Sequence, residues 1–295
     1  MKYLLAVVIP LVPLCLSNPV FAQDTPPQTT AGDQEISVGL GIPETIDLQG
    51  YIGVALGVSP NYQGSDEVSA VGLPLVDIRQ EGFLFIRGAS VNPNDGYGSI
   101  GWNALNFGYS AGGERKFGLS IGPMIRFNAG RDEGDNSVLN GLGDIDDSVG
   151  SGGFIEARAG NWFADVGAVS QDAGDADDGL SVALRSGYTA QISERMSITP
   201  TVFSSWGNDD YMQGFYGVNS SQATRSGLAQ FNAESGFKDV GIQIGTTYSM
   251  SDSFLINGQI GYQRLLGDAA DSPIVDNNSG SRDQFRALIG MAYKF

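Results

Sequence analysis

The sequence predicts an all-β protein, a transmembrane antiparallel β-barrel of about twelve strands with short periplasmic turns and long acidic outer loops. Apolar and polar residues alternate in repeated segments, and no apolar run after the first residues is long enough for a membrane-spanning helix. The third observation is the final segment, 283–295, which has one apolar face: Phe285, Ala287, Ile289, Met291, Tyr293 and Phe295. On this segment alone, the edge strand of a soluble β-sandwich is the alternative.

The opposite face of segment 283–295 is mostly small or charged, with Leu288 as an apolar exception. In outer-membrane barrels the last strand closes against the first, and its apolar face contacts lipid. We therefore interpret Tyr293 and Phe295 as the terminal signal by which the barrel assembly machinery recognises and closes the sheet.

Residues 1–22 are predicted to be a cleaved signal peptide, because Lys2 precedes an apolar run that contains two prolines and ends near Ala22. Cys15 lies in this segment, so the mature chain has no cysteine to form a disulfide. Residues 23–48 are expected to be a flexible periplasmic segment, with a short strand at 35–40 outside the barrel count. The barrel is predicted over residues 49–295.

The charge of the chain argues against nucleic acid as a partner. Loss of Lys2 leaves 15 basic and 33 acidic residues, which does not favour a basic binding surface. The 42 glycines in 295 residues are about twice the usual share, as expected for a Gly-rich, helix-poor exported barrel.

The alternation begins in the first predicted strand, where Ile52, Val54 and Leu56 share the outward face. The second strand contains Pro74, which requires a sheet edge or a bulge. In the fourth, Trp102 and Leu105 have opposite parity, which predicts a β-bulge between them. The twelve predicted strands are 49–58, 68–79, 82–90, 96–109, 116–129, 150–159, 162–170, 180–192, 196–206, 237–250, 253–265 and 283–295.

Short and long connections alternate between these strands, which predicts periplasmic turns at one end and outer loops at the other. Aromatic residues gather at both predicted ends, as in the girdles of membrane barrels. They are Phe117, Trp162, Tyr188, Tyr248, Phe254 and Tyr293 at the periplasmic end, and Phe127, Trp206, Tyr262 and Phe285 at the outer end.

Five charged residues are predicted to face the lumen: Arg126, Glu156, Arg158, Asp165 and Arg185. They could form a permeation filter, or a network of paired charges that braces or plugs the barrel, and the second interpretation is favoured. The longest loop, 207–236, could be a ligand-binding lid, although its aromatic residues more readily pack over or into the barrel mouth.

Histidine is absent, which excludes Ser-His and Cys-His nucleophilic mechanisms and zinc sites that contain histidine. Paired carboxylates for glycoside chemistry are disfavoured, because the acids cluster in loops. The acidic loops 143–147 and 172–179 could bind calcium, or hold divalent cations that bridge to lipopolysaccharide, but they lack the EF-hand spacing. We predict no catalytic residue, no cofactor and no metal site.

Several stretches occur in the same order as in a known family. They are YQGSD at 62–66, PLVD at 74–77, DDYMQ at 209–213, FYGV at 215–218, QATRSGL at 222–228, FKDVG at 237–241 and RLLGDAADSPIV at 264–275. With these stretches the chain resembles the MltA-interacting protein family, also called the OmpV family. The resemblance implies an outer-membrane barrel without catalytic residues. For the member that names the family, it implies a scaffold that joins a murein-cleaving lytic transglycosylase to a bifunctional murein synthase.

Three functions follow as hypotheses. The first is a non-enzymatic scaffold for murein-remodelling enzymes, and the second is a channel or small-solute porin. The third is a surface adhesin that uses the acidic loops, since relatives have been linked to adhesion and stress response. In each case the expected surroundings are outer-membrane lipid and lipopolysaccharide.

Overall fold

The computed structural model describes residues 34–40, 47–80, 82–88, 90–111, 114–174 and 178–295. The predicted signal peptide lies outside the described residues, as does most of the predicted periplasmic segment. Within the described ranges, no helix is long and apolar enough to cross a membrane.

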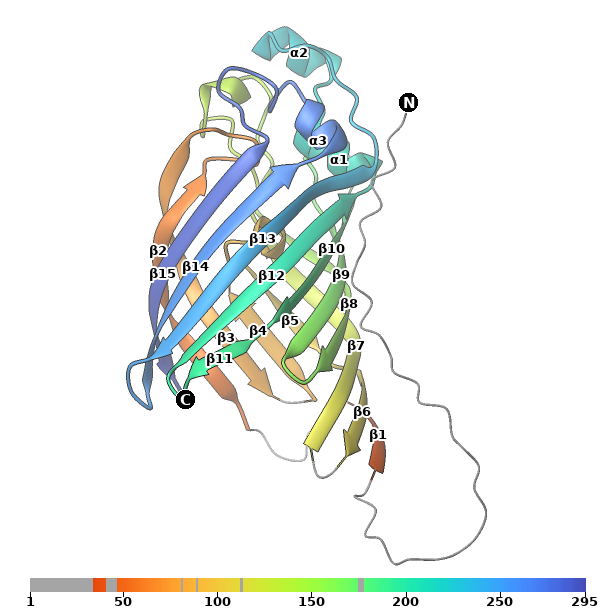
Figure 1. Cartoon of the computed structure of the whole chain (residues 1–295). Helices are drawn as coiled ribbons and strands as arrows, with labels where there is room; N and C mark the ends of the chain where they lie inside the picture. Colours follow the sequence, from red (N-terminus) through yellow and green to blue (C-terminus); the bar gives the residue numbers. More distant parts are fainter. Residues whose placement is uncertain (1–33, 41–46, 81, 89, 112–113, 175–177) are drawn as a thin grey trace, which may run out of the picture. The chain divides into compact units, whose positions relative to one another are not determined.

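Fifteen strands form one sheet in which every pairing is antiparallel (Figure 1). The strands are β1 (Gln34–Leu40), β2 (Gln49–Pro60), β3 (Val68–Gln80), β4 (Leu84–Gly88), β5 (Gly98–Trp102), β6 (Leu105–Ala111), β7 (Glu114–Asn128), β8 (Ser148–Ala159), β9 (Trp162–Gln171), β10 (Gly179–Tyr188), β11 (Ala190–Ser193), β12 (Met196–Gly207), β13 (Gly236–Ser249), β14 (Phe254–Leu265) and β15 (Asp283–Lys294).

The ring contains twelve strand positions, as the sequence predicts. β5 and β6 both pair with β7 and are two parts of one position, and β10 and β11 share β12 in the same way. The ring closes through the pairs β15–β2 and β7–β8. β1 lies outside the ring and pairs with β6. In a closed sheet the backbone N–H and C=O groups pair with those of the neighbouring strands, whereas lipid offers them no hydrogen-bond partner.

The predicted bulge lies between β5 and β6. Gly101 pairs with Met124 and Leu105 with Ile121, so the register advances four residues on one strand and three on the other. The extra residue restores the outward face. Trp102 and Leu105 are therefore both exposed, at 43% and 41%.

The apolar face predicted for β2 and β15 points outward. Val54, Leu56 and Ile289 are 68%, 67% and 64% exposed, whereas Leu288 on the inner face is 7% exposed. Aromatic pairs lie at both ends of the wall. The ring centroids are 4.9 Å apart in Trp162–Tyr188 and 5.6 Å in Phe254–Tyr293 at the short-turn end, and 5.0 Å in Tyr262–Phe285 at the long-loop end. This belt is the surface expected to contact lipid.

The last residue completes the closure. The backbone N–H of Phe295 donates to the carbonyl of Gly50 at 3.1 Å, and the N–H of Gly50 donates back at 3.2 Å. Gly50 has φ of 151°, and a Cβ there would lie 1.9 Å from the carbonyl oxygen of Asp77. Only glycine fits at this position, where the backbone pair of Gly50 and Phe295 forms the first rung of the ladder between β2 and the end of the chain.

A cap covers the long-loop end of the barrel, and we define it by four connections: 61–67, 129–147, 208–235 and 266–282. Loop 208–235 carries helices α1 (Asp209–Tyr216) and α2 (Ser220–Ser226), and α3 (Gly267–Asp271) follows β14 (Figure 1). Asn208 and Asn219 cap the first two helices with their side chains. The apolar residues of the cap form two buried clusters, which include Tyr211, Met212 and Tyr216 in one and Tyr62, Leu139 and Val218 in the other. The aromatic residues of the long loop thus pack over the barrel mouth.

Candidate functional site

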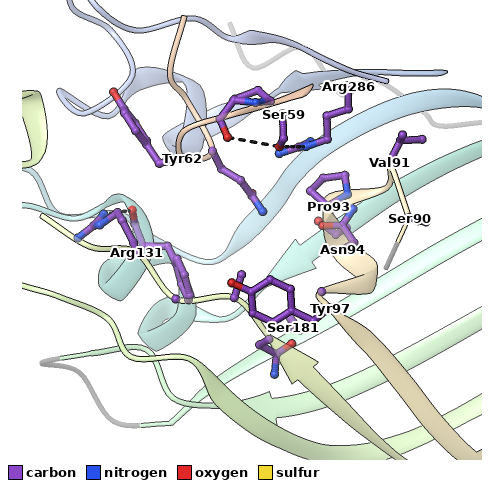
Figure 2. Close-up of a pocket in the computed structure, with 18 of the residues that line it drawn as sticks. Ser59, Tyr62, Ser90, Val91, Pro93, Asn94, Tyr97, Arg131, Ser181 and Arg286 are labelled. Atoms are coloured by element: carbon purple, nitrogen blue, oxygen red, sulfur yellow. Dashed lines mark hydrogen bonds between the residues drawn. The ribbon is translucent and has the colours of Figure 1, made fainter. Parts of the chain in front are cut away.

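The connection between β4 and β5 folds into the lumen, and we call residues 90–97 the inward segment. It contains the short 3₁₀ helix η1 (Pro93–Asp95), whose N-terminal residue is a proline and whose cap is the side chain of Asn92. Val91 is 2% exposed and joins an apolar cluster with wall residues that include Leu75 and Leu288. Figure 2 shows Val91, Pro93 and Asn94 inside the barrel. The inward segment therefore fills part of the lumen.

A buried ion pair anchors the inward segment. Nζ of Lys238 lies 3.3 Å from the carboxylate of Asp239 and donates to Oδ1 of Asn94 at 2.8 Å. The carboxylate of Asp239 accepts from Asn94 at 3.2 Å, from Ser205 at 2.7 Å and from Gln263 at 2.8 Å. Both charged residues are at most 1% exposed. Since buried charges are tolerated only when paired and hydrogen-bonded, this cluster fixes the position of η1.

Two consecutive residues point inward here because the strand is bulged. The register between β12 and β13 shifts between Ser205 and Trp206, so that Ser205 pairs with Asp239 and Trp206 with Phe237. Lys238 is the extra residue, and it is directed into the lumen beside Asp239.

Replacing Lys238 with methionine is expected to lower the free energy of unfolding by about 3–5 kcal/mol, because the substitution leaves the buried carboxylate of Asp239 without its cation. The measurement is the urea midpoint of the refolded protein in detergent. Lys116→Met is the control, since Lys116 is half exposed and its ion pair with Glu114 is at the surface. Equal midpoints for the two variants would contradict the structural role of the buried pair.

Four of the five predicted lumen charges lie in ion pairs. Glu156 pairs with Arg158 at 2.8 Å and also with Arg87. Asp165 and Arg185 pair at 2.8 Å, and Arg185 also reaches Asp95 of the inward segment at 3.5 Å. The Arg87–Glu156 pair joins β4 to β8, the Asp165–Arg185 pair joins the neighbouring strands β9 and β10, and the Arg185–Asp95 pair ties the inward segment to the wall. This arrangement can brace the barrel.

The fifth predicted residue, Arg126, differs from the other four. It is 6% exposed, and no described carboxylate lies in an ion pair with it. Asp95 and Asp165 line a small cavity beside it, and both are paired with Arg185. Arg87, Asp95 and Arg286 are further lumen charges that were not predicted from the sequence. The parity of Arg286, opposite Phe285, was the signal that could have identified it.

A cavity of about 290 Å³ lies between the inward segment and the cap (Figure 2). Besides Arg126, its cationic lining includes Arg131 from the loop after β7 and Arg286 from β15. Arg286 donates to Oγ of Ser59 at 3.1 Å and to Oε1 of Gln263 at 3.0 Å, and Arg131 donates to the carbonyl of Phe215 at 2.8 Å. Burial lowers the pKa of Arg131 to about 10, so its guanidinium stays charged at neutral pH. With Lys238, four cationic side chains of the described residues and one carboxylate, that of Asp135, line the cavity.

In the part of the chain that the structure describes, no group of three or more potential metal-ligating side chains gathers in one place. In the predicted acidic loops, Asp144 accepts from the N–H of Glu133, Asp147 from that of Gly130 and Asp172 from that of Gly174. Residues 175–177 of the second loop lie outside the described residues. These three carboxylates thus order the loop backbone.

Sequences similar to this chain include the members of one family model and several named relatives. The family model described as MltA-interacting protein MipA matches residues 52–295. Putative outer membrane protein YiaT of Escherichia coli K12 is 24% identical over 149 residues, which cover 50% of this chain and 58% of that protein. MltA-interacting protein of the same strain is 26% identical over 102 residues, which cover 34% and 38%. The matched stretches thus span 58% and 38% of these relatives.

Solved structures similar to this chain are distant in sequence. OmpT of Vibrio cholerae has 9% identity and a TM-score of 0.38, and the match covers 88% of this chain and 98% of that one. The NanC porin has 10% identity and a TM-score of 0.43, with coverage of 83% and 100%. An outer membrane channel from Pseudomonas putida F1 has 12% identity and a TM-score of 0.37, with coverage of 85% and 97%.

Proposed function

Because the chain belongs to the MltA-interacting protein family, we propose that it is a non-enzymatic barrel that serves as a scaffold for murein-remodelling enzymes. Its location is the outer membrane, because a relative is named as an outer membrane protein. The closed sheet with an apolar outer belt is also the structure that outer-membrane proteins have. The family match carries the proposal, since it extends over the barrel from β2 to the final residue. The proposed partners are a lytic transglycosylase and a bifunctional murein synthase.

The filling of the lumen supports the scaffold over an open porin. The inward segment, the ion pairs and two apolar clusters occupy the space inside the wall. The second cluster consists of Phe85, Met124, Phe154 and Val169, all at most 7% exposed. A porin keeps a water-filled passage, whereas a scaffold needs only a stable wall.

Strand β1 offers a docking surface at the short-turn end. It pairs with β6 over that strand's whole length, from Leu105 to Ala111, and within the described strands it has no second partner. Ile36, Val38 and Leu40 are 79%, 66% and 71% exposed. An unpaired strand edge can accept an extended segment of another protein.

The test is retention of the purified lytic transglycosylase and murein synthase on the immobilised barrel in detergent. The wild type is expected to retain both enzymes. Ser37→Pro/Val38→Pro is expected to lose them, because two adjacent prolines remove strand N–H groups from β1. Asp252→Pro, in a turn at the same end, is the matched control and is expected to behave as wild type. Failure of the wild-type barrel to retain either enzyme would refute the scaffold proposal.

An adhesin would have to act through the long-loop end. The apolar side chains of the two cap clusters are buried, with Leu139 and Val218 at 0% exposure. What the cap offers to a partner is a polar, acidic surface. The scaffold remains the function that the family and the lumen support together.

A further inference from the structure

The barrel wall is notched where the β4–β5 hairpin stops short. β3 pairs with β2 from Val68 to Arg79, but it pairs with β4 only from Asp77 to Gln80. β4 ends at Gly88 and β5 begins at Gly98, and the chain between them turns into the lumen. On the side of β4, residues 68–75 of β3 therefore have no strand partner in the described chain.

Two loops of the cap close this notch from above and make it a window. Nδ2 of Asn61, in the loop between β2 and β3, donates to the carbonyl of Asp135 at 3.3 Å. A second hydrogen bond runs from the other loop, where Nδ2 of Asn136 donates to Oε2 of Glu67 at 3.2 Å. Tyr62 also packs in one buried cluster with Leu139 and Leu142. The window is thus bounded by β3, the tip of the β4–β5 hairpin and the joined loops.

The window opens within the apolar belt. The residues of β3 that border it pair with the outward-facing residues of β2: Ala70 with Val58, Gly72 with Leu56 and Pro74 with Val54. Those three β2 residues are 43%, 67% and 68% exposed. At this depth the surroundings of the wall are acyl chains rather than water. Pro74 on the unpaired side agrees with the preference of proline for sheet edges.

The 290 Å³ cavity lies directly behind the window. Val71 and Leu73, on the inner face of β3, belong to its lining, as do Pro93 and Tyr97 from the hairpin tip. The unpaired part of β3 thus stands between the outer, apolar face of the wall and an interior that contains cations.

Three of the four cationic residues that line the cavity form no ion pair with a described carboxylate, whereas the fourth, Lys238, pairs with Asp239. No described carboxylate forms an ion pair with Arg126, Arg131 or Arg286, although acids outnumber bases by 33 to 16 in the whole chain. Nε of Arg131 is buried without a hydrogen-bond partner. Asp135 is the acidic residue of the lining. Buried guanidinium groups with unused donors favour a bound anion, because carboxylates and phosphates match their geometry.

We propose that this cavity binds the anionic headgroup of a single-chain amphiphile that enters from the bilayer through the window. The headgroup, a phosphate or carboxylate, contacts Arg126 and Arg286, and the acyl chain leaves past Leu73 into the membrane. The cavity volume suits a headgroup and the first carbons of a chain rather than a whole phospholipid.

The test uses the full barrel in phosphatidylcholine nanodiscs and radiolabelled dodecyl phosphate, with empty nanodiscs as the background for partitioning. Saturable binding is expected in the wild type. Arg126→Gln and Arg286→Gln are each expected to weaken it about tenfold, the usual effect of losing a hydrogen bond to a charged group. Arg264→Gln is the matched control, because Arg264 is half exposed and pairs with Asp283 outside the cavity. Heat-modifiable migration on gels verifies the folding of every variant.

Two competitors and one further variant separate lateral entry from a site for water-soluble anions. Dodecyltrimethylammonium is expected not to compete, and inorganic phosphate is expected to compete only weakly. Leu73→Trp, which narrows the window, is expected to weaken dodecyl phosphate binding and to leave inorganic phosphate binding unchanged. No saturable binding, or equal affinity in the wild type and both arginine variants, overturns the site. Equal competition by inorganic phosphate, with no effect of Leu73→Trp, overturns the entry through the window.

Discussion

Removal of Phe295 is expected to reduce the amount of folded protein in the outer membrane several-fold. The truncation deletes the rung that Phe295 and Gly50 form with two backbone hydrogen bonds, worth about 1–3 kcal/mol together and more in lipid. It also removes the aromatic end of the outward face, which we interpret with Tyr293 as the signal for barrel assembly. The measurement is the heat-modifiable band in outer-membrane fractions.

Phe295→Tyr is the control for this truncation. It retains the backbone rung and an aromatic ring that is 45% exposed in the wild type, so near-normal levels are expected. Phe295→Ala separates the two contributions, because it keeps the rung and removes the ring. Normal outer-membrane levels of the truncated chain would contradict both the rung and the signal.

Release of the inward segment is expected to convert the barrel into a channel. Val91→Gly, Asn94→Gly and Asp95→Gly together remove the apolar anchor, the contacts with Lys238 and Asp239, and the ion pair with Arg185. Without these contacts the segment no longer holds its place in the lumen. Discrete conductance steps in planar bilayers are expected for the triple variant and not for the wild type.

A triple variant of α2, Ser220→Gly, Ser221→Gly and Thr224→Gly, is the control, because these residues lie on the surface of the cap. It is expected to remain silent in the bilayer. Stable steps of equal size in the wild type would show an open lumen and would favour the porin hypothesis over the scaffold.

The wall of the barrel could be predicted because one simple rule determines it. Outward residues face lipid at every second position, so Ile52 to Val58 and Phe285 to Tyr293 could be recognised without any knowledge of their neighbours. The bulge between Trp102 and Leu105 followed from the same rule, since it restores the outward face. Leu288 does not follow this rule, because it is a large apolar residue on the inner face. It packs in the lumen with Ala55, Leu75 and Val91.

The interior could be predicted only where it obeys the same alternation. Glu156, Arg158, Asp165 and Arg185 stand on inward parity, and the structure pairs them. Lys238 and Asp239 are adjacent, so no alternating pattern can direct both inward, and only the bulge opposite Ser205 does so. The position of the inward segment could not be predicted either, because a short polar connection has the same composition whether it is exposed to solvent or turns into the lumen.

The cap joins the two ends of the barrel sequence. The hydroxyl of Tyr62, in the first loop of the ring, donates to the carbonyl of Ile274, in the last loop, at 3.0 Å. The side chain of Gln284 likewise accepts from the N–H of Gly64 and donates to the carbonyl of Ser65. Because these contacts join the loop after β2 to β15 and the loop before it, they are expected to form when β15 pairs with β2. Protease resistance of the surface loops in intact cells is therefore expected to report completed closure of the barrel.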